Sequence, residues 1–321
     1  DFSGKCLNWS KIILFSMVYF STGKHLVFLW LLFFSIEGFS QEGINLFESK
    51  VLTVPSSFTI GVEGPAVDKN GNLYAVNFQR QGTIGIVTPN GNANVFIELP
   101  KGSIGNGIRI SNQGDMYVAD YTGHNILKIE MQSKKISVFA HDSLMIQPND
   151  IAITKYNTFF ASNPNWKDGT GSVWYANKKG KIVMRETNMG TTNGIEVSPD
   201  NNKLYVNESL QRKVWQYKIN RKGKLKNKKL LIEFTDYGMD GMRCDVNGNL
   251  YIARYGKGTV AIVSPAGKFI KEVRLIGKNP TNIAFGGADG KTVYVTMQDR
   301  GNIECFITDT AGNEWNQIQK Q

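Results

Sequence analysis

Short runs of alternating apolar and polar residues, separated by turn-forming residues, extend along most of the chain. The stretch 193–207 is representative: a polar residue and Gly open it, an alternating segment follows, and a Pro-Asp-Asn-Asn turn leads into a Leu-Tyr-Val segment. A period of two residues is typical of strands, and residues 41–321 show no sustained 3.6-residue period. The pattern therefore predicts an all-β fold with very little helix.

The unit at 193–207 occurs six times. Its opening residues are Glu63, Asn106, Asn149, Asn193, Asp240 and Asn282, at spacings of 43, 43, 44, 47 and 42 residues. An all-strand repeat of about 40–45 residues is typical of a β-propeller with one four-stranded antiparallel blade per repeat. We predict a six-bladed β-propeller. An N-terminal strand at Lys50–Val54 is expected to close it by pairing with the blade that ends near Trp315–Ile318, which removes a free sheet edge.

Residues 1–40 do not follow the repeat. Lys24 and His25 precede an apolar run of eleven residues, 26–36, and Gly38-Phe39-Ser40 precedes Gln41. This order predicts a secretory signal with its h-region at 26–36 and cleavage near 40/41, and a single domain over 41–321. The expected location is periplasmic or extracellular. A retained membrane anchor is the alternative, although eleven residues are too few to span a bilayer as a helix. Whether residues 1–23 belong to the protein stays open.

If the repeats are blades, the six opening residues occupy one structural position around the central axis. Two of them, Glu63 and Asp240, supply carboxylates, and Asn149 and Asn193 supply amide oxygens. Hard divalent cations prefer such oxygen ligands, and two carboxylates offset a 2+ charge. Ca²⁺ is the expected ion, with Mg²⁺ and Mn²⁺ as alternatives; Zn²⁺ is disfavoured because the ring has no Cys or His. The other interpretation is that short polar residues begin the inner strands because the channel is wet.

Several motifs resemble the gluconolactonase/regucalcin (senescence marker protein) family over about residues 45–310. These motifs are Glu63-Gly-Pro, Gln147-Pro-Asn-Asp150, Asn193-Gly-Ile, Asp240-Gly-Met, Phe285-Gly-Gly287 and Tyr294-Val-Thr296. The resemblance implies a six-bladed propeller with one axial divalent ion that hydrolyses lactones or related esters. It implies that the metal ligands are Glu63, Asn149, Asn193 and Asp240. It also implies that Asp240 handles the proton of the attacking water, and that Asn149, Asn106 and Gln147 face the substrate.

Two positions depart from the sugar-lactone members of that family. Gln147 stands where those members typically carry Arg, and Lys167 or Asp168 stands where they carry a substrate-binding Glu. The predicted function is metal-dependent hydrolysis of a small-molecule lactone or ester, with a sugar acid lactone less expected as substrate. The alternative is a non-catalytic exported propeller that binds a protein or glycan. The acids Glu63 and Asp240 favour the hydrolase, because a scaffold would not need them.

The remaining signals are weaker. The formal net charge is +10, and much of the excess lies in Arg221–Lys229. This run is interpreted as a solvated hairpin tip or as a patch for weak contact with a polyanion, and no nucleic-acid motif accompanies it. Cys244 and Cys305 are expected to be buried apolar residues, and a disulfide between them stays open. His124 is either a loop residue bonded to solvent or backbone, or a residue placed above the metal.

Overall fold

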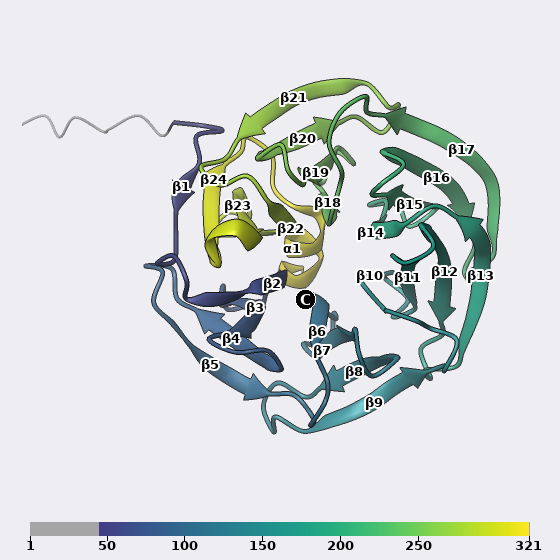
Figure 1. Cartoon of the computed structure of the whole chain (residues 1–321), viewed down its shortest axis with the longest axis horizontal. Coiled ribbons are helices and arrows are strands. Elements are labelled where there is room, and N and C mark those ends of the chain that lie inside the picture. Colours follow the sequence, from purple (N-terminus) through teal and green to yellow (C-terminus); the bar gives the residue numbers. More distant parts are fainter. Residues whose placement is uncertain (1–44, 321) are drawn as a thin grey trace, which may run out of the picture. The chain divides into compact units, whose positions relative to one another are not determined.

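The computed structural model describes residues 45–320. In these residues the alternating segments form six four-stranded antiparallel sheets arranged around a central channel (Figure 1). The prediction of a six-bladed β-propeller is confirmed. The expected signal segment, with its h-region at 26–36 and cleavage near 40/41, lies outside the described residues.

The first three blades follow the order of the sequence, from the channel outward. Blade 1 contains β2 (Phe58–Val67), β3 (Leu73–Phe78), β4 (Thr83–Val87) and β5 (Ala93–Glu98). Blade 2 contains β6 (Gly105–Ile110), β7 (Met116–Asp120), β8 (Asn125–Ile129) and β9 (Ile136–His141). Blade 3 contains β10 (Ile151–Ile153), β11 (Phe159–Asn165), β12 (Thr170–Ala176) and β13 (Ile182–Met189).

The other three blades have the same arrangement, except that blade 6 takes its outer strand from the N-terminal part of the chain. Blade 4 contains β14 (Thr192–Val197), β15 (Lys203–Glu208), β16 (Lys213–Ile219) and β17 (Leu225–Glu233). Blade 5 contains β18 (Met242–Cys244), β19 (Leu250–Arg254), β20 (Thr259–Val263) and β21 (Phe269–Arg274). Blade 6 contains β22 (Pro280–Gly286), β23 (Thr292–Met297), β24 (Asn302–Ile307) and β1 (Lys50–Val51), with the 3-10 helix η1 (Gln298–Arg300) before β24.

The closing strand forms at the predicted place but is shorter than predicted. Lys50 lies opposite Cys305 and Val51 opposite Glu304, so β1 covers the outer edge of β24. The segment Trp315–Ile318 is not a strand, and this part of the prediction is wrong. It lies in the helix α1 (Asn313–Gln319). Because β1 occupies the outer edge of β24, the C-terminal segment does not pair there, and Trp315 and Ile318 pack on the hydrophobic core from a helix.

The hydrophobic core lies between the blades. Six clusters of buried apolar side chains occupy the interfaces between neighbouring blades, including the interface of blade 6 with blade 1. Second strands such as β3 are buried along their whole length, whereas outer strands such as β5 are largely exposed. Polar side chains on the inner strands are therefore unusual for their position, because these strands face the channel and not the outer surface.

The two faces of the propeller differ. We call the face where the inner strands begin the ring face, and the face where they end the far face. On the far face α1 spans from blade 5 to blade 1: Val246 N donates to Ala311 O, and Gln319 Nε2 donates to Lys69 O at 3.0 Å. The helix thus covers the far end of the channel. Figure 1 shows α1 near the centre of the ring of blades.

Two further observations concern the described residues. Cys244 and Cys305 are buried free thiols, so the pairing that the sequence left open does not occur in this structure. Over residues 45–320, no helix has the length and apolar character needed to cross a membrane.

Candidate functional site

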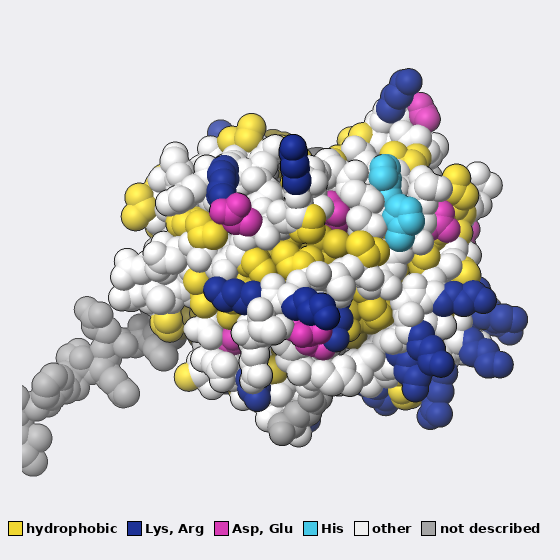
Figure 2. Space-filling view, turned by 90° about the horizontal axis from the view of Figure 1, so that it is seen from below, with side chains coloured by type: hydrophobic (Ala, Val, Ile, Leu, Met, Phe, Trp, Pro, Cys, Tyr) yellow, Lys and Arg dark blue, Asp and Glu magenta, His cyan; other side chains and the backbone are white. Residues whose placement is uncertain are grey.

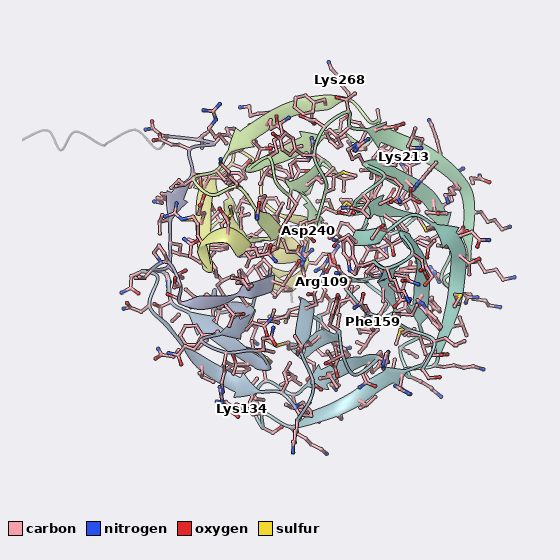
Figure 3. All side chains as sticks on the ribbon, viewed as in Figure 1. Arg109, Lys134, Phe159, Lys213, Asp240 and Lys268 are labelled. Carbon is pink, nitrogen blue, oxygen red and sulfur yellow. The ribbon has the colours of Figure 1, made fainter. Side chains whose placement is uncertain are left out.

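The six opening residues of the repeats lie where the inner strands begin. Four lie within β2, β6, β14 and β22, and the other two, Asn149 and Asp240, lie two residues before the first residue of β10 and of β18. In these four strands the pairing register shifts beside the opening residue, for example between Thr192 and Ile195. Such bulges bend a strand and redirect its side chains. Asp240 lies at the channel in Figure 3, whereas Lys134, Lys213 and Lys268 lie at the perimeter.

Steric crowding explains why glycine follows several of the opening residues. A Cβ on Gly241 would overlap the side-chain amide of Asn282 in the next blade, and a Cβ on Gly64 would overlap the backbone carbonyl of Asn106. Gly64 also has a φ of 55°, which favours glycine. The polar-Gly pair in the repeat is therefore the place where neighbouring blades converge on the axis.

Hydrogen bonds connect the opening residues from blade to blade. Asn282 Nδ2 donates to Glu63 Oε2 at 2.9 Å, and the Gly64 backbone N–H donates to the same oxygen at 2.6 Å. Between blades 2 and 3, Asn106 Nδ2 donates to the backbone carbonyl of Asn149 at 3.0 Å. Asn106 and Asn282 thus link blades and orient their neighbours, in addition to lining the channel.

The two amides predicted as ligands carry unused acceptors. The Oδ1 atoms of Asn149 and Asn193 are buried and accept no hydrogen bond. Asn207 on β15 shares this property, and its Nδ2 donates to the backbone carbonyl of Asp240 at 2.6 Å. A buried carbonyl oxygen without a partner is costly, and a bound cation is one way to satisfy it.

The two acids of the ring resist ionisation in the absence of a cation. Burial, followed by the charge of Asp150, raises the pKa of Glu63 from 4.5 to about 7. Burial and the charge of Glu63 raise the pKa of Asp240 well above its usual value, while a hydrogen bond from Asn193 acts in the opposite direction. The Glu63 and Asp240 carboxyl groups are close enough for each to shift the pKa of the other. Three of the four predicted ligands, Glu63, Asp240 and Asn193, are therefore brought together.

A second charged layer, which the sequence analysis missed, lies below the ring. Asp150 Oδ1 pairs with Arg109 at 3.1 Å and Asp150 Oδ2 with Arg243 at 3.2 Å, all three side chains being buried. Arg243 Nη1 also donates to Asn282 Oδ1 at 3.0 Å, which fixes the amide so that its Nδ2 faces Glu63. Figure 3 shows both Arg109 and Asp240 near the channel axis.

Two more acids complete this layer toward the far face. Glu196 lies 3.5 Å from Arg109, and Glu314 of α1 lies 3.9 Å from Arg109 and 3.7 Å from Arg243. The signal for this layer was present in the sequence. Arg109, Glu196 and Arg243 each stand three residues after an opening residue, in strands that are otherwise apolar.

The donor set fits a divalent cation. The channel holds five carboxyl groups, those of Glu63, Asp150, Glu196, Asp240 and Glu314, and only two guanidinium groups. Glu63, Asp150 and Glu196 are buried, and an excess of acid in such a place needs protons or a bound cation. Among residues 45–320, no group of three or more His, Cys, Asp or Glu side chains is placed to hold a metal. The candidate set at the ring instead combines two carboxylates with amide oxygens, which suits Ca²⁺.

The remaining predicted site residues lie outside this cluster. Gln147 is half-buried, and its backbone N–H donates to Asn163 Oδ1 at 2.8 Å. Asp168 is exposed and accepts a hydrogen bond from Asn165 within its own loop. His124 Nδ1 bonds to the backbone carbonyl of Met145, which agrees with the interpretation as a backbone-bonded loop residue.

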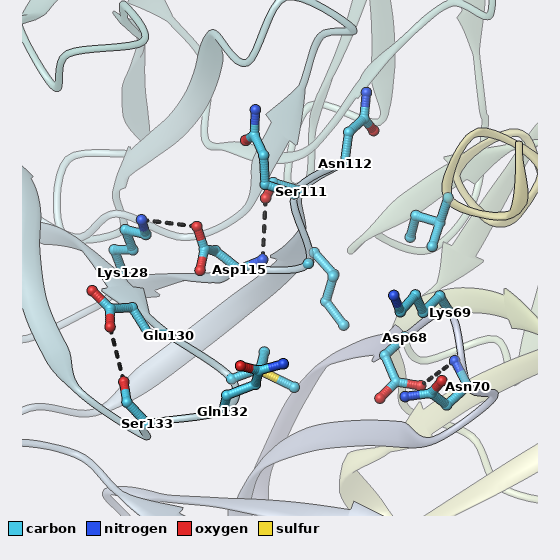
Figure 4. Close-up of a pocket in the computed structure, with 15 residues that line it drawn as sticks. Asp68, Lys69, Asn70, Ser111, Asn112, Asp115, Lys128, Glu130, Gln132 and Ser133 are labelled. Atoms are coloured by element: carbon cyan, nitrogen blue, oxygen red, sulfur yellow. Dashed lines mark hydrogen bonds and ion pairs between the residues drawn. The ribbon is translucent and has the colours of Figure 1, made fainter. Parts of the chain in front are cut away.

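A large groove lies away from the ring. A groove of about 690 Å³ lies on the far face, lined by the turns after β2, β6 and β8 and by Ile318 of α1 (Figure 4). Its charged side chains are partly neutralised, since Lys128 pairs with Asp115 at 2.8 Å. The groove contains none of the six opening residues, so we place the candidate site from the chemistry of the ring and not from cavity size.

Known proteins resemble the chain over the whole propeller. A family model described as SMP-30/Gluconolactonase/LRE-like region matches residues 62–299. A gluconolactonase from Zymomonas mobilis is 25% identical over 289 residues, which covers 78% of this chain and 79% of that protein. A diisopropyl-fluorophosphatase from Loligo vulgaris is 25% identical and covers 77% of this chain and 88% of that protein.

A solved structure shares the fold. The calcium-binding protein regucalcin from Agrobacterium tumefaciens superposes with a TM-score of 0.72, covering 83% of this chain and 96% of that chain. Its sequence identity is 20%, so the likeness shows the fold alone.

Proposed function

Because the chain belongs to the SMP-30/gluconolactonase/LRE-like family, we propose that it hydrolyses a lactone or related ester with the help of a divalent cation, Ca²⁺ in the first place. The observation that carries the proposal is the convergence of the Glu63 and Asp240 carboxyl groups with the Asn193 amide, in a ring where the Oδ1 atoms of Asn149 and Asn193 are buried and unpaired. Relatives named gluconolactonase and a structural neighbour described as calcium-binding support it.

In the proposed mechanism Glu63, Asn149, Asn193 and Asp240 hold the cation. When bound, the cation supplies polarisation of the substrate carbonyl and stabilises the negative charge that develops on its oxygen. Asp240 accepts a proton as water adds to the carbonyl carbon, and the ring C–O bond then breaks. The leaving alkoxide takes up that proton, which leaves a hydroxy acid and the starting carboxylate.

The other ring residues position the reacting groups. Asn282, itself fixed by Arg243, holds Glu63 so that one carboxylate oxygen is already hydrogen-bonded. Asn149 and Asn106 are proposed to face the substrate together with Gln147. Since α1 covers the far end of the channel, the substrate is expected to enter from the ring face. Gln147 offers no positive charge, which favours a lactone without a carboxylate at that position.

A panel of γ- and δ-lactones tests the proposal. We expect hydrolysis of at least one lactone, followed as acid release, with loss of activity in EDTA and recovery on adding Ca²⁺. An exposed acid of a nearby loop gives a matched control: Asp168→Asn should retain activity, whereas Asp240→Asn should lose it. No hydrolysis across the panel by a protein that is stabilised by Ca²⁺ would refute the enzyme and favour a binding propeller.

A further inference from the structure

Positive charge gathers on one corner of the far face, at blades 3 and 4. The turns 154–158, 177–181 and 220–226 carry one, three and four Lys or Arg residues, eight in all, and no Asp or Glu. All eight side chains are exposed. We call these three turns the basic corner. In Figure 2, dark blue side chains gather at the lower right, on the side where Figure 1 places β13 and β17.

The basic corner is fixed on the propeller and is not a free hairpin tip. Arg185 of β13 donates from Nη2 to the backbone carbonyl of Lys222 at 2.8 Å, and its guanidinium lies 5.0 Å from the ring centre of Tyr175. Gly223, with a φ of 67°, sits so close to the Tyr175 ring that a Cβ there would overlap it. Arg221 lies 5.0 Å from the ring centre of Tyr156. Blade 3 thus holds the turn of blade 4 in place.

These cations have no acidic partners. Between residues 45 and 320, ion pairs involve Lys128 and Lys257 among the lysines, and none of the eight residues of the basic corner. The nearest acids along the same elements are Glu186 on β13 and Asp200 in the turn after β14, and neither pairs with them. Eight unpaired, positioned charges on one surface repel one another, so the corner is disfavoured unless an anionic partner is near.

The chemistry of the corner selects the kind of partner. The aromatic faces here are already covered: Lys155 and Arg221 both contact the ring of Tyr156, and Tyr175 is buried. Stacking platforms for nucleic-acid bases or sugar rings are therefore missing at this corner. What remains is a set of exposed cations without acidic partners on three neighbouring turns, which suits a layer of anionic groups. Clusters of four to eight Lys or Arg bind anionic lipid headgroups in this way.

We propose that the basic corner docks the propeller on the surface of an anionic phospholipid bilayer. Docking through the far face leaves the ring face, with Glu63 and Asp240, turned toward solution.

The test is co-sedimentation of the full chain with vesicles. Vesicles of phosphatidylcholine with about 30% phosphatidylglycerol are compared with pure phosphatidylcholine, at about 0.1 M and about 0.5 M NaCl. We expect binding to the anionic vesicles at low salt and its loss at high salt. The variant Lys178→Glu, Lys179→Glu, Lys222→Glu, Lys224→Glu should bind the anionic vesicles at least about a hundredfold more weakly, because each cation near the surface contributes about fivefold.

A second quadruple variant controls for bulk charge. It makes the same charge change at exposed cations outside the corner: Lys101→Glu, Lys268→Glu, Arg274→Glu and Lys278→Glu. The control should keep most of the binding, and both variants should melt like the parent. Equal losses in the two variants, equal binding to neutral vesicles, or no binding to anionic vesicles would each overturn the proposal. Binding of a duplex DNA probe without vesicle binding would do so too and would assign the corner to nucleic acid.

Discussion

Replacing Asp240 by Asn tests the cation site without disturbing its shape. Asn is a close mimic of protonated Asp240: it has the same size and donates a hydrogen bond to Glu63, but it cannot ionise. Without a cation, ionising this pair is costly, and the rise of the pKa of Glu63 from 4.5 to about 7 corresponds to about 3 kcal/mol. The folded state therefore loses stability as the pH rises from about 4.5 to about 7, and Asp240 adds a change of the same sign.

Without a cation, Asp240→Asn should consequently be at least as stable as the parent at pH 8. With Ca²⁺ the order should reverse. At a Ca²⁺ concentration of about a hundred times Kd, the parent gains about 2.7 kcal/mol. If losing one carboxylate weakens binding about a hundredfold, the variant gains only about 0.4 kcal/mol at the same concentration. For a domain of this size the difference is roughly 5–10 °C in Tm.

Thermal melts of the parent and of Asp240→Asn at pH 8, with EDTA and with Ca²⁺, measure the order of stability in each condition. Asp168→Asn is the matched control, since Asp168 is exposed in a loop and bonds only to Asn165. It should respond to Ca²⁺ like the parent. Strong destabilisation of Asp240→Asn in EDTA would contradict this prediction, because it would mean that the Asp240 carboxyl group does not destabilise the cation-free protein. The prediction also fails if the variant keeps the full response to Ca²⁺.

Two further predictions follow from the ring and from the layer below it. Gly241→Ala should lower Tm by several degrees and abolish the Ca²⁺ response, because the added Cβ would overlap the side chain of Asn282. Gly238→Ala is the control and should do neither, because the nearest atom to its Cβ would lie at 3.5 Å. Burial raises the pKa of Glu196 to about 8, so the folded protein holds a proton there that the unfolded chain releases above about pH 4.5, and stability falls as the pH rises between these values. Glu196→Gln should therefore gain about 3 kcal/mol relative to the parent between pH 5 and pH 8, measured by denaturant unfolding; a constant difference across this range would contradict it.

Much of the fold follows from local pattern. The repeat spacing and the strand alternation predict the six blades because each blade buries the same positions against its neighbours. The helix α1 was not predicted, since seven residues without a side-chain cap give little local signal. Its formation depends on the far face of the channel, where Glu314 meets Arg109 and Arg243, and on the closed edge of β24.

The candidate site was predictable only in part. Glu63 and Asp240 could be placed together because equivalent positions of a propeller converge on its axis. The layer formed by Asp150, Arg109 and Arg243 requires knowing which side chains cross the channel, and this depends on bulges and on side-chain length. A charged residue three positions after the opening residue is the local sequence signal of this charged layer. The same position can be checked in other propeller sequences.

The two-residue strand β1 has a consequence for the protein at high concentration. Blade 6 is completed by a segment that is distant in the sequence from its other three strands, and Ser49 adds a hydrogen bond to Glu304 at this seam. The same few contacts can form between two molecules, each lending its first strand to the other. Dimers made by such strand exchange would keep both channels intact. They would therefore have the same activity per chain as the monomer and would differ from it only in mass.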